Sequence, residues 1–392
     1  MTMTKSSLLL VIVMVIVMVK PTNMKRINLL LITILAAVMF SCKPDNPVNP
    51  HGFTVGSGVF VLNEGNFQFS NGSLSFYDPV ADTVANNLFY KVNNAPLGDV
   101  AESMAMMDGK LYIIVNNSNL IYKVDANTMV CDTTKPFKLT DFYSPREMFV
   151  VAPNKAYVSD LIGTDLWIIN PQDMTHTGTI AMGNTTEKML QVGNELYVSN
   201  WSYYYIDAYS HESYKTVQVV DLNNDLKVAD IEVGKEPNTM VVDKNGHVWV
   251  LCEGRSWEDE FGENPTLWEI DPMLKTATQR YEFKGPFDFD DDIKGVATAL
   301  KANPAGDQFY LIYNDDVRRF DLATMSLSET FRITPGPDGL FYNLAVDPRT
   351  GDLYVTDAKN YMMNGTVYRY SSDGLLLASF EAGLIPSAML FK

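Results

Sequence analysis

The residues best suited to binding a ligand are amides and carboxylates that follow short, aromatic-centred apolar runs. Asn63 and Glu64 follow the run 59–62, and Asn200 and Trp201 follow the run 196–198. The equivalent polar segments along the chain are 63–67, 116–119, 159–160, 199–201, 253–257, 314–316 and 356–359. Asn and Asp at the end of a strand also fold back on the local backbone to form turns, so a structural role is the alternative for each of them.

Aromatic residues accompany these polar segments, where a loop that only reverses the chain would have little use for them. They are Phe67, Phe69, Trp201, Tyr203, Tyr204, Tyr205, Trp257 and Tyr361. Two of the segments, 201–214 and 257–265, are also long for hairpin connections, and long loops are commonly functional. Aromatic and amide groups on one face would bury a large, flat ligand with polar edges. The alternative is that the aromatic residues cap a wet sheet edge.

Catalysis and metal binding have little support in the sequence. The four histidines are scattered, no histidine pair has metal-ligand spacing, and neither a Gly-x-Ser-x-Gly motif nor a phosphate-binding loop is present. The acidic run 288–292 suits Ca²⁺ in its residue types but lacks the glycine and the closing glutamate of an EF-hand, which favours a solvated acidic loop. We therefore predict a protein that is not an enzyme, with no catalytic residues, no metal and no cofactor.

A pair of strands that recurs seven times must position these residues. The first strand of each pair is centred on an aromatic residue: Phe60, Tyr112, Tyr157, Tyr197, Trp249, Tyr310 and Tyr354. The second strand ends at a polar residue: Asp78, Asp125, Asn170, Asp221, Asp271, Asp321 and Ser371. A further short strand precedes six of the pairs, which gives units of about 45 residues with about four strands each. This pattern predicts an all-β, seven-bladed β-propeller; a β-solenoid, the alternative, would have shorter and more even repeats.

The first strand pair lacks its preceding strand, and the missing copy lies at the C-terminus, in residues 387–391. We expect this last strand to complete the first blade, which closes the ring and removes an exposed sheet edge. In such a ring the loops that enter the innermost strands lie on the same face as the polar segments described above. These loops are 99–102, 144–147, 185–187, 236–238, 292–294, 340–343 and 384–386. Together the two sets predict a polar ring around the mouth of the central channel.

The N-terminal region has the features of an export signal. Met24, Lys25 and Arg26 precede the apolar run 27–40, while the earlier run 8–19 is too short to span a bilayer. A small residue before Cys42 resembles a lipoprotein cleavage site, with a chance cysteine after an ordinary signal peptide as the alternative. We predict a signal peptide at 1–41 with its true start at Met24, a lipidated Cys42 and flexible tether at 42–57, and the propeller at 58–392.

The net charge restricts the class of binding partner, and the cysteine positions restrict disulfide formation. Residues 1–41 contain four basic residues and no acidic one, so their removal changes the net charge from −17 to −21. Such a surface repels phosphate backbones, which argues against a nucleic-acid partner. Cys131 and Cys252 fall in the second and fifth repeats, too far apart for a disulfide, and are predicted to be free thiols.

Four segments of the chain resemble a known group of proteins. Segments 58–67, 97–104, 199–203 and 383–386 are similar to the seven-bladed YncE-like propeller lipoproteins of gut Bacteroidetes, some of which are called surface layer proteins. The resemblance covers essentially all of residues 53–392 and is most specific in the Asn-Glu-Gly-Asn run at 63–66 and the Asn-Trp-Ser-Tyr loop at 200–203.

The best understood members of that group capture cobalamin and pass it to a TonB-dependent outer-membrane transporter. The resemblance implies a non-catalytic, lipid-anchored receptor on the surface of the outer membrane, with cobalamin or another corrinoid as bound ligand rather than cofactor. Candidate contacts, taken from face position and from the resemblance, are Asn63, Glu64, Asn66, Phe67, Glu102, Asn117, Arg146, Glu187, Asn200, Trp201 and Tyr203. The alternatives are a scaffold that binds a protein or glycan, and a lyase or hydrolase with a metal in the channel.

Overall fold

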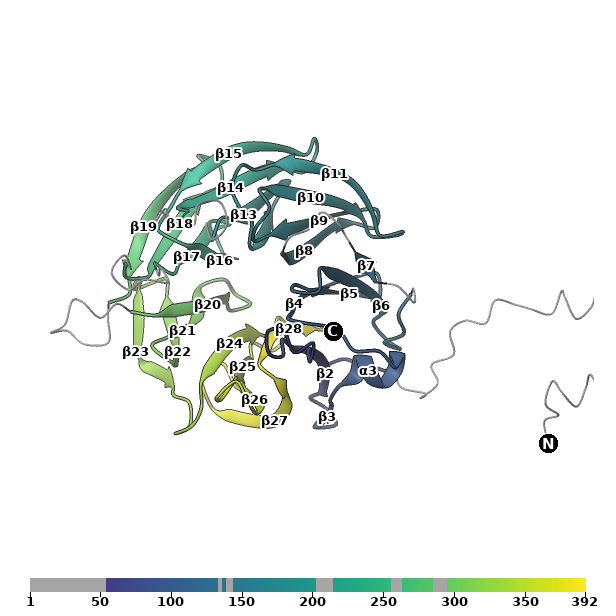
Figure 1. Ribbon diagram of the computed structural model, residues 1–392. Helices are drawn as coiled ribbons and strands as arrows, with labels where there is room; N and C mark the ends of the chain where they lie inside the picture. The colour runs from purple at the N-terminus through teal and green to yellow at the C-terminus, as the bar shows by residue number, and fades with distance from the viewer. Residues whose placement is uncertain (1–53, 133–135, 139–143, 202–213, 255–262, 285–294) are drawn as a thin grey trace, which may run out of the picture. The chain divides into compact units, whose positions relative to one another are not determined.

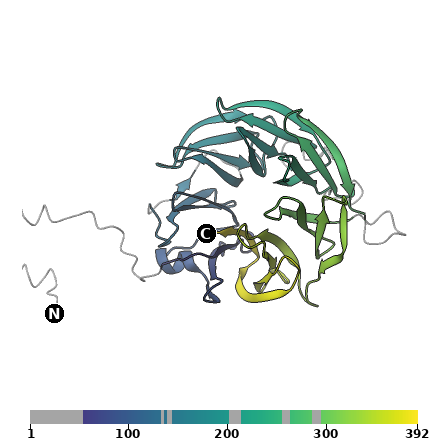
Figure 2. The same cartoon turned by 180° about the vertical axis from the view of Figure 1, so that it is seen from behind.

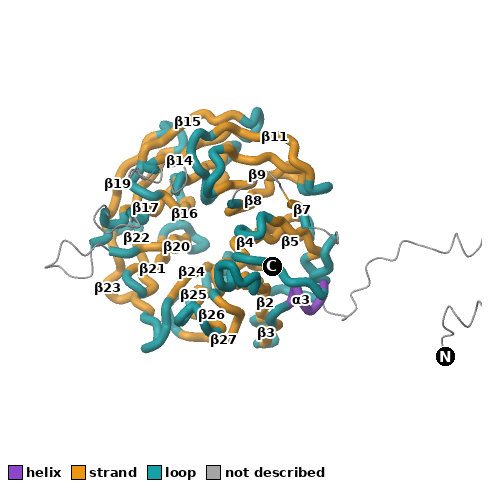
Figure 3. The backbone as a smooth tube through the Cα atoms, in the orientation of Figure 1, coloured by secondary structure: helices purple, strands orange, loops and turns teal. Residues whose placement is uncertain are grey.

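The computed structural model describes residues 54–132, 136–138, 144–201, 214–254, 263–284 and 295–392. These residues form seven four-stranded antiparallel sheets arranged as the blades of a β-propeller, as the repeat predicts (Figure 1). Strands dominate the fold, and the described part contains one helix, α3 (Leu88–Asn93), which buries Leu88, Phe89 and Val92 (Figure 3). No helix in these residues is both long and apolar enough to cross a membrane.

Each blade consists of an innermost, a second, a third and an outermost strand. The innermost strands of blades 1 to 7 are β28 (Pro386–Phe391), β4 (Ala101–Met107), β8 (Pro145–Ala152), β12 (Met189–Val192), β16 (Pro237–Val242), β20 (Ala297–Ala302) and β24 (Phe341–Val346). The second strands are β1 (Val59–Asn63), β5 (Lys110–Val115), β9 (Lys155–Asp160), β13 (Glu195–Ser199), β17 (Val248–Cys252), β21 (Gln308–Tyr313) and β25 (Leu353–Asp357).

The two outer positions of each blade complete the sheets. The third strands are β2 (Ser73–Asp78), β6 (Leu120–Asp125), β10 (Asp165–Asn170), β14 (Thr216–Asp221), β18 (Thr266–Asp271), β22 (Asp316–Asp321) and β26 (Asn364–Tyr370). The outermost strands are β3 (Thr83–Ala85), β7 (Phe137–Lys138), β11 (Thr175–Ala181), β15 (Leu226–Glu232), β19 (Thr276–Glu282), β23 (Ser326–Ile333) and β27 (Leu376–Leu384). Six of the third strands end on the predicted polar residue, and β26 ends one residue before Ser371.

The ring closes through the C-terminal strand. β28 pairs antiparallel with β1, with Met389 opposite Val61 and Leu390 opposite Phe60, so the last residues form the innermost strand of blade 1. Figures 1 and 2 show the C-terminal strand beside the N-terminal strands, seen from the two sides of the propeller. The expected closure is therefore confirmed.

The hydrophobic core lies between blades rather than within one. The described residues form seven apolar clusters, each of which joins two neighbouring blades. The cluster that seals the ring joins blades 1 and 7, and in it the rings of Tyr77 and Phe380 stack at 4.2 Å. The second strands are buried along nearly their whole length because neighbouring blades cover both of their faces. Cys131 and Cys252 are free thiols, the first half-buried and the second buried.

Candidate functional site

Six of the seven innermost strands contain an irregularity where they pair with the second strand. The register shifts at Ala101/Ser103, Pro145/Met148, Pro237/Met240, Thr298/Lys301 and Phe341/Asn343, and the β1–β28 pairing shifts opposite Val61 and Asn63. A bulge of this kind inserts one extra residue and redirects the side chains beside it. The redirected side chains lie at one end of the strands and point into the channel.

The result is a central cavity of about 410 Å³ that every blade helps to line. One lining residue from each innermost strand, in chain order, is Glu102, Arg146, Met189, Asn238, Lys301, Asn343 and Ser387. Tyr342 of β24 and four residues from the adjoining loops complete the wall: Glu64, Glu187, Trp201 and Glu253. Residues from both predicted sets of loops therefore meet in one cavity.

Arg146 is the centre of an ionic network that joins blades 2, 3 and 4. Its Nη1 donates to Glu102 at 2.7 Å, and its Nε and Nη2 donate to the two oxygens of Glu187 at 2.8 and 3.0 Å. Burial opposes the charge of Arg146, but Glu102 and Glu187 outweigh it and raise the pKa of Arg146. Burial likewise disfavours the charged form of Glu187, but Arg146 and Lys188 outweigh it and lower the pKa of that carboxyl. Arg146 and Glu187 are thus both charged at neutral pH.

Trp201 connects this network to blade 5. Its ring lies 5.9 Å from the guanidinium carbon of Arg146, and its Nε1 donates to Glu253 at 3.0 Å. The other carboxylate oxygen of Glu253 accepts a hydrogen bond of 2.9 Å from Asn238. These contacts hold the indole at the cavity wall, and the aromatic ring remains partly exposed.

Glu64 and Tyr342 form a second polar group on the side of blades 1 and 7. The phenol of Tyr342 donates to Glu64 at 3.0 Å. Burial, together with the nearby Glu102, raises the pKa of Glu64 to about 7. Burial and the Glu64 carboxyl raise the pKa of Tyr342 well above its usual value. The carboxyl of Glu64 is therefore divided between its neutral and charged forms at neutral pH.

Lys301, Lys188 and Glu147 lie on the side of blades 3, 4 and 6. Burial and the charge of Lys188 lower the pKa of Lys301 to about 8. Burial raises the pKa of Glu147, which accepts a hydrogen bond of 2.6 Å from the backbone N–H of Met189. The cavity thus has an acidic side around Glu64 and a side with two lysines.

Exposed apolar residues lie next to the acidic side of the cavity. We call them the apolar rim: Phe67, Phe69, Tyr361, Met362 and Met363, which are 62%, 74%, 41%, 78% and 57% exposed. The two loops of the rim are joined by a hydrogen bond of 2.7 Å from Asn66 to the carbonyl of Tyr361. The ring of Tyr361 also meets that of Tyr342 edge-on at 6.0 Å. The rim therefore borders the cavity.

Comparison with known protein families identifies the family to which this chain belongs. The model for the Domain of unknown function (DUF5074) matches residues 57–391. The chain belongs to this family. Among the curated proteins, none is significantly similar to the chain.

Solved structures similar to the chain share its propeller architecture. They include a quinonprotein alcohol dehydrogenase-like protein from Bacteroides thetaiotaomicron, with a TM-score of 0.62 and 17% identity over 87% of this chain and 79% of that one. They also include the periplasmic gluconolactonase of Pseudomonas aeruginosa, with a TM-score of 0.61 and 13% identity over 85% and 99% of the two chains. At these identities the likeness establishes the fold of the family member and not its activity.

The predicted contact residues that the structure describes fall into three groups. Glu64, Glu102, Arg146, Glu187 and Trp201 line the cavity. Asn66 and Phe67 lie in the loop that carries the apolar rim. Tyr203 and the predicted lipidation site Cys42 lie outside the described residues, as does the acidic run 288–292.

The third group, Asn63, Asn117 and Asn200, binds other parts of the protein. Asn63 is fully buried, donates to Ser75 at 3.1 Å and accepts from the N–H of Gly383 at 2.9 Å. Asn200 is also fully buried and donates to the carbonyl of Thr185 at 2.8 Å, while Asn117 donates to Asp99. These hydrogen bonds are those of the structural alternative, in which the amides hold loops in place, and none of the three residues lines the cavity.

Several lining residues were not among the predicted contacts: Glu147, Lys188, Asn238, Glu253, Lys301 and Tyr342. The two lysines could have been found from the sequence, because each is a charged residue inside or beside a short, apolar innermost strand. Such a strand borders the channel, so a charge there faces it.

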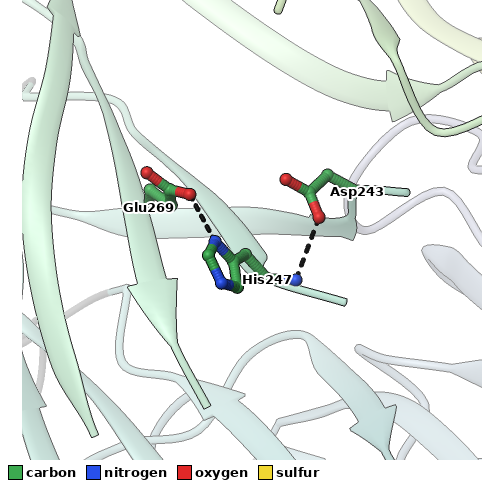
Figure 4. A group of neighbouring side chains, drawn as sticks. All are labelled: Asp243, His247 and Glu269. Atoms are coloured by element: carbon green, nitrogen blue, oxygen red, sulfur yellow. Dashed lines mark hydrogen bonds and ion pairs between the residues drawn. The ribbon is translucent and has the colours of Figure 1, made fainter. Parts of the chain in front are cut away.

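A second polar cluster lies in blade 5, at the other end of β17 from Glu253. Asp243, His247 and Glu269 place a carboxylate, an imidazole and a carboxylate within 4.8 Å of one another (Figure 4). Asp243 accepts the N–H groups of Asn245 at 2.8 Å and His247 at 3.0 Å, and its other oxygen accepts the indole of Trp249. These hydrogen bonds tie the cluster to its own hairpin turn and give it a structural role there.

Proposed function

We propose that this protein is a non-catalytic, lipid-anchored receptor of the outer-membrane surface that binds cobalamin or another corrinoid. The ligand would lie on the face that carries the central cavity and would be passed to a TonB-dependent transporter. The observation that supports this most is the combination of a polar cavity of about 410 Å³ with an exposed apolar rim at its edge.

The chemistry of a corrinoid suits this combination. A corrin is broad and flat and carries amide side chains around its edge, so it presents an apolar face and many hydrogen-bonding groups. The volume falls in the range of about 300–1,000 Å³ for small-molecule pockets and is too small for a whole corrinoid. The macrocycle would lie across the mouth against Trp201 and the rim, with its side chains reaching carboxylates and amides below.

The closed ring makes the site rigid before the ligand arrives. Arg146 ties three blades together, and the backbone of Glu64 is held by Ile385 at 2.9 Å and by Ala101 at 3.2 Å. Groups that are already fixed lose little freedom on binding, which favours affinity.

Binding rather than catalysis is proposed because of how the lining residues are used. No histidine lines the cavity in the described residues, and Ser103 donates its hydroxyl to the carbonyl of Arg146. The resemblance of segments 58–67 and 199–203 to cobalamin-capturing lipoproteins is the sequence argument for the ligand. The predicted signal peptide and Cys42 are the argument for the anchor.

A second candidate is a scaffold that binds a protein or glycan. The exposure of Met362 at 78% and Phe69 at 74% favours it, because large exposed apolar side chains in one place mark interaction surfaces. In that case the rim, and not the cavity, would supply most of the contact.

The deciding experiment uses colour. Purified mature protein mixed with cyanocobalamin and then desalted should retain the red ligand, and titration calorimetry should detect heat at micromolar protein. A colourless eluate without heat would refute the corrinoid assignment and leave the scaffold.

Trp201→Ala tests which surface is involved. We expect at least a roughly tenfold loss of affinity for cyanocobalamin, since one aromatic contact and its buried area are removed, with an unchanged circular dichroism spectrum. Tyr90→Ala is the matched control, because Tyr90 is 47% exposed on α3 and does not line the cavity. Equal affinity in both variants would remove Trp201 from the site.

A further inference from the structure

Lys301 reaches the cavity because of the bulge in β20. Thr298 pairs with Ile312 and Lys301 pairs with Tyr310, so two residues of β20 lie opposite one residue of β21. Ala299, within the bulge, has a φ of 60°, a conformation that residues other than glycine seldom adopt. The bulge allows Thr298, Ala299 and Lys301 all to line the cavity, which simple alternation along a strand would not permit.

Lys301 is also the cation of the cavity without a partner. Among the described lining residues, Arg146 is bound by Glu102 and Glu187, and Lys188 lies 3.5 Å from Glu187. With the residues that the structure describes, Lys301 forms neither a hydrogen bond nor an ion pair. A charged group removed from bulk water is costly unless something balances it. The position is therefore arranged for a group that the chain itself does not provide.

The charges that act on Lys301 come from other blades. Among the described residues, Lys188 of blade 4 lowers the pKa of Lys301, and the carboxyl of Glu147 of blade 3 acts in the opposite direction and more weakly. Figure 1 shows β20 and β8 on opposite sides of the ring, and Lys301 lines the cavity that both strands border. Glu147 receives the N–H of Met189, and Glu187 is held by Arg146 and Lys188. Two ammonium groups thus face one part of the cavity.

We propose that Lys301, together with Lys188, forms an anion-binding subsite that takes a carboxylate or phosphate group of the ligand. Lysine binds such groups as a compact point charge, and charge-assisted hydrogen bonds are among the strongest in proteins. This subsite deepens the proposed function and rests on it for the identity of the whole ligand. In a corrinoid that carries a nucleotide loop, the phosphodiester would supply the anion.

The first experiment probes the subsite without any corrinoid. Each lysine of the mature protein is acetylated with an N-hydroxysuccinimide ester at pH 8, and its rate is followed by peptide mass spectrometry. Titrations with inorganic phosphate and with acetate are made at constant ionic strength with sodium chloride. A bound anion within about 4–6 Å raises a lysine pKa by one unit or more, which reduces the reactive free amine up to about tenfold.

We expect phosphate, acetate or both to slow the acetylation of Lys301 several-fold and saturably, while exposed Lys244 serves as internal control and keeps its rate. Protection by phosphate alone identifies the group as a phosphate, and protection by acetate identifies a carboxylate as sufficient. Equal rates at Lys301 with and without either anion would overturn the proposal, whatever the protein does with cobalamin.

The second experiment compares two corrinoids and two variants. Cyanocobalamin carries the phosphodiester and dicyanocobinamide does not, so Lys301→Gln should weaken binding of the first about tenfold or more and leave the second unchanged. Lys244→Gln should change neither affinity. Equal losses for both corrinoids would overturn the phosphodiester as the anion, while binding of neither corrinoid by the wild type would refute the corrinoid and leave the first experiment decisive for the subsite.

Discussion

The cavity network and the blade-5 turn cluster contain similar side chains but use them differently. In the turn cluster, Asp243, His247 and Glu269 find their partners within blade 5, from the backbone of the same turn and from Arg280. In the cavity, the single side chain of Arg146 binds carboxylates of two other blades. A polar cluster that is satisfied by its own hairpin stabilises that hairpin. A cluster assembled from several blades exists only when the ring is closed.

The two clusters also differ in what remains unsatisfied. Both carboxylate oxygens of Asp243 accept N–H groups of the turn or of Trp249, whereas in the cavity Lys301 has no partner among the described residues and Glu64 has a pKa of about 7. Buried groups with strongly shifted pKa values gather at functional sites. Incomplete pairing therefore distinguishes the cavity, for which we propose a ligand, from the turn cluster, although both contain the same residue types.

The largest difference between the clusters should follow removal of their arginines. Arg146→Met leaves Glu102 without its cation and Glu187 with Lys188 at 3.5 Å, and because Glu187 is 1% exposed, we expect a loss of about 3 kcal/mol in the free energy of unfolding. Arg280→Met is the matched control, since Arg280 is 41% exposed and its pair with Glu269 is worth about 1 kcal/mol or less. Urea unfolding measures both. Equal losses would abolish the distinction drawn between the clusters.

The second test uses the pH dependence of stability. Glu64 has an ordinary pKa of 4.5 and a folded-state pKa of about 7, so the folded state binds the extra proton between these values. The contribution of Glu64 is fully favourable below pH 4.5 and is lost as the pH rises through about 7. The total is up to about 3 kcal/mol.

Glu64→Gln should therefore flatten the fall in unfolding free energy between pH 4.5 and 8 relative to the wild type. Glu232→Gln, on the exposed outer strand β15, should leave the profile unchanged. If the wild type and Glu64→Gln have parallel profiles, Glu64 is an ordinary carboxylate, and the acidic side of the cavity loses its distinguishing property.

The sequence predicts the strands well because their signals are local. The aromatic centres, the polar ends and the displaced C-terminal strand all lie where the seven repeats indicate.

The site is harder to predict, for a reason that two pairs of neighbouring residues illustrate. Asn63 and Asn200 turn into the protein, while Glu64 and Trp201, one residue later, line the cavity. Adjacent side chains of an extended chain point to opposite sides, so a polar pair does not reveal which member faces the channel.

The bulges hide the remaining lining residues from the sequence. Lys301 faces the channel only because Ala299 and Leu300 together oppose a single residue of β21. Bulge positions follow from how a strand is paired and bent within the closed ring, and neither is encoded in a short window. The partners of Arg146 are likewise 41 and 44 residues away and meet it only through ring geometry.

The smallest effect is expected at His247, where the turn cluster can be tested as a metal site. The hydrogen bond to Glu269 raises the pKa of His247, so its contribution is fully present below about pH 6.5 and is lost as the pH rises through the higher folded-state pKa. Because His247 is about one-third exposed, His247→Gln should lower the free energy of unfolding by about 1 kcal/mol or less at pH 6 and by nothing measurable at pH 9. The affinity for cyanocobalamin should not change.

Zinc should leave the melting temperature of both proteins unchanged, since the oxygens of Asp243 already accept three N–H groups. A melting temperature that zinc raises in the wild type and not in His247→Gln would make the cluster a metal centre, and local satisfaction of polar groups would no longer identify a structural turn.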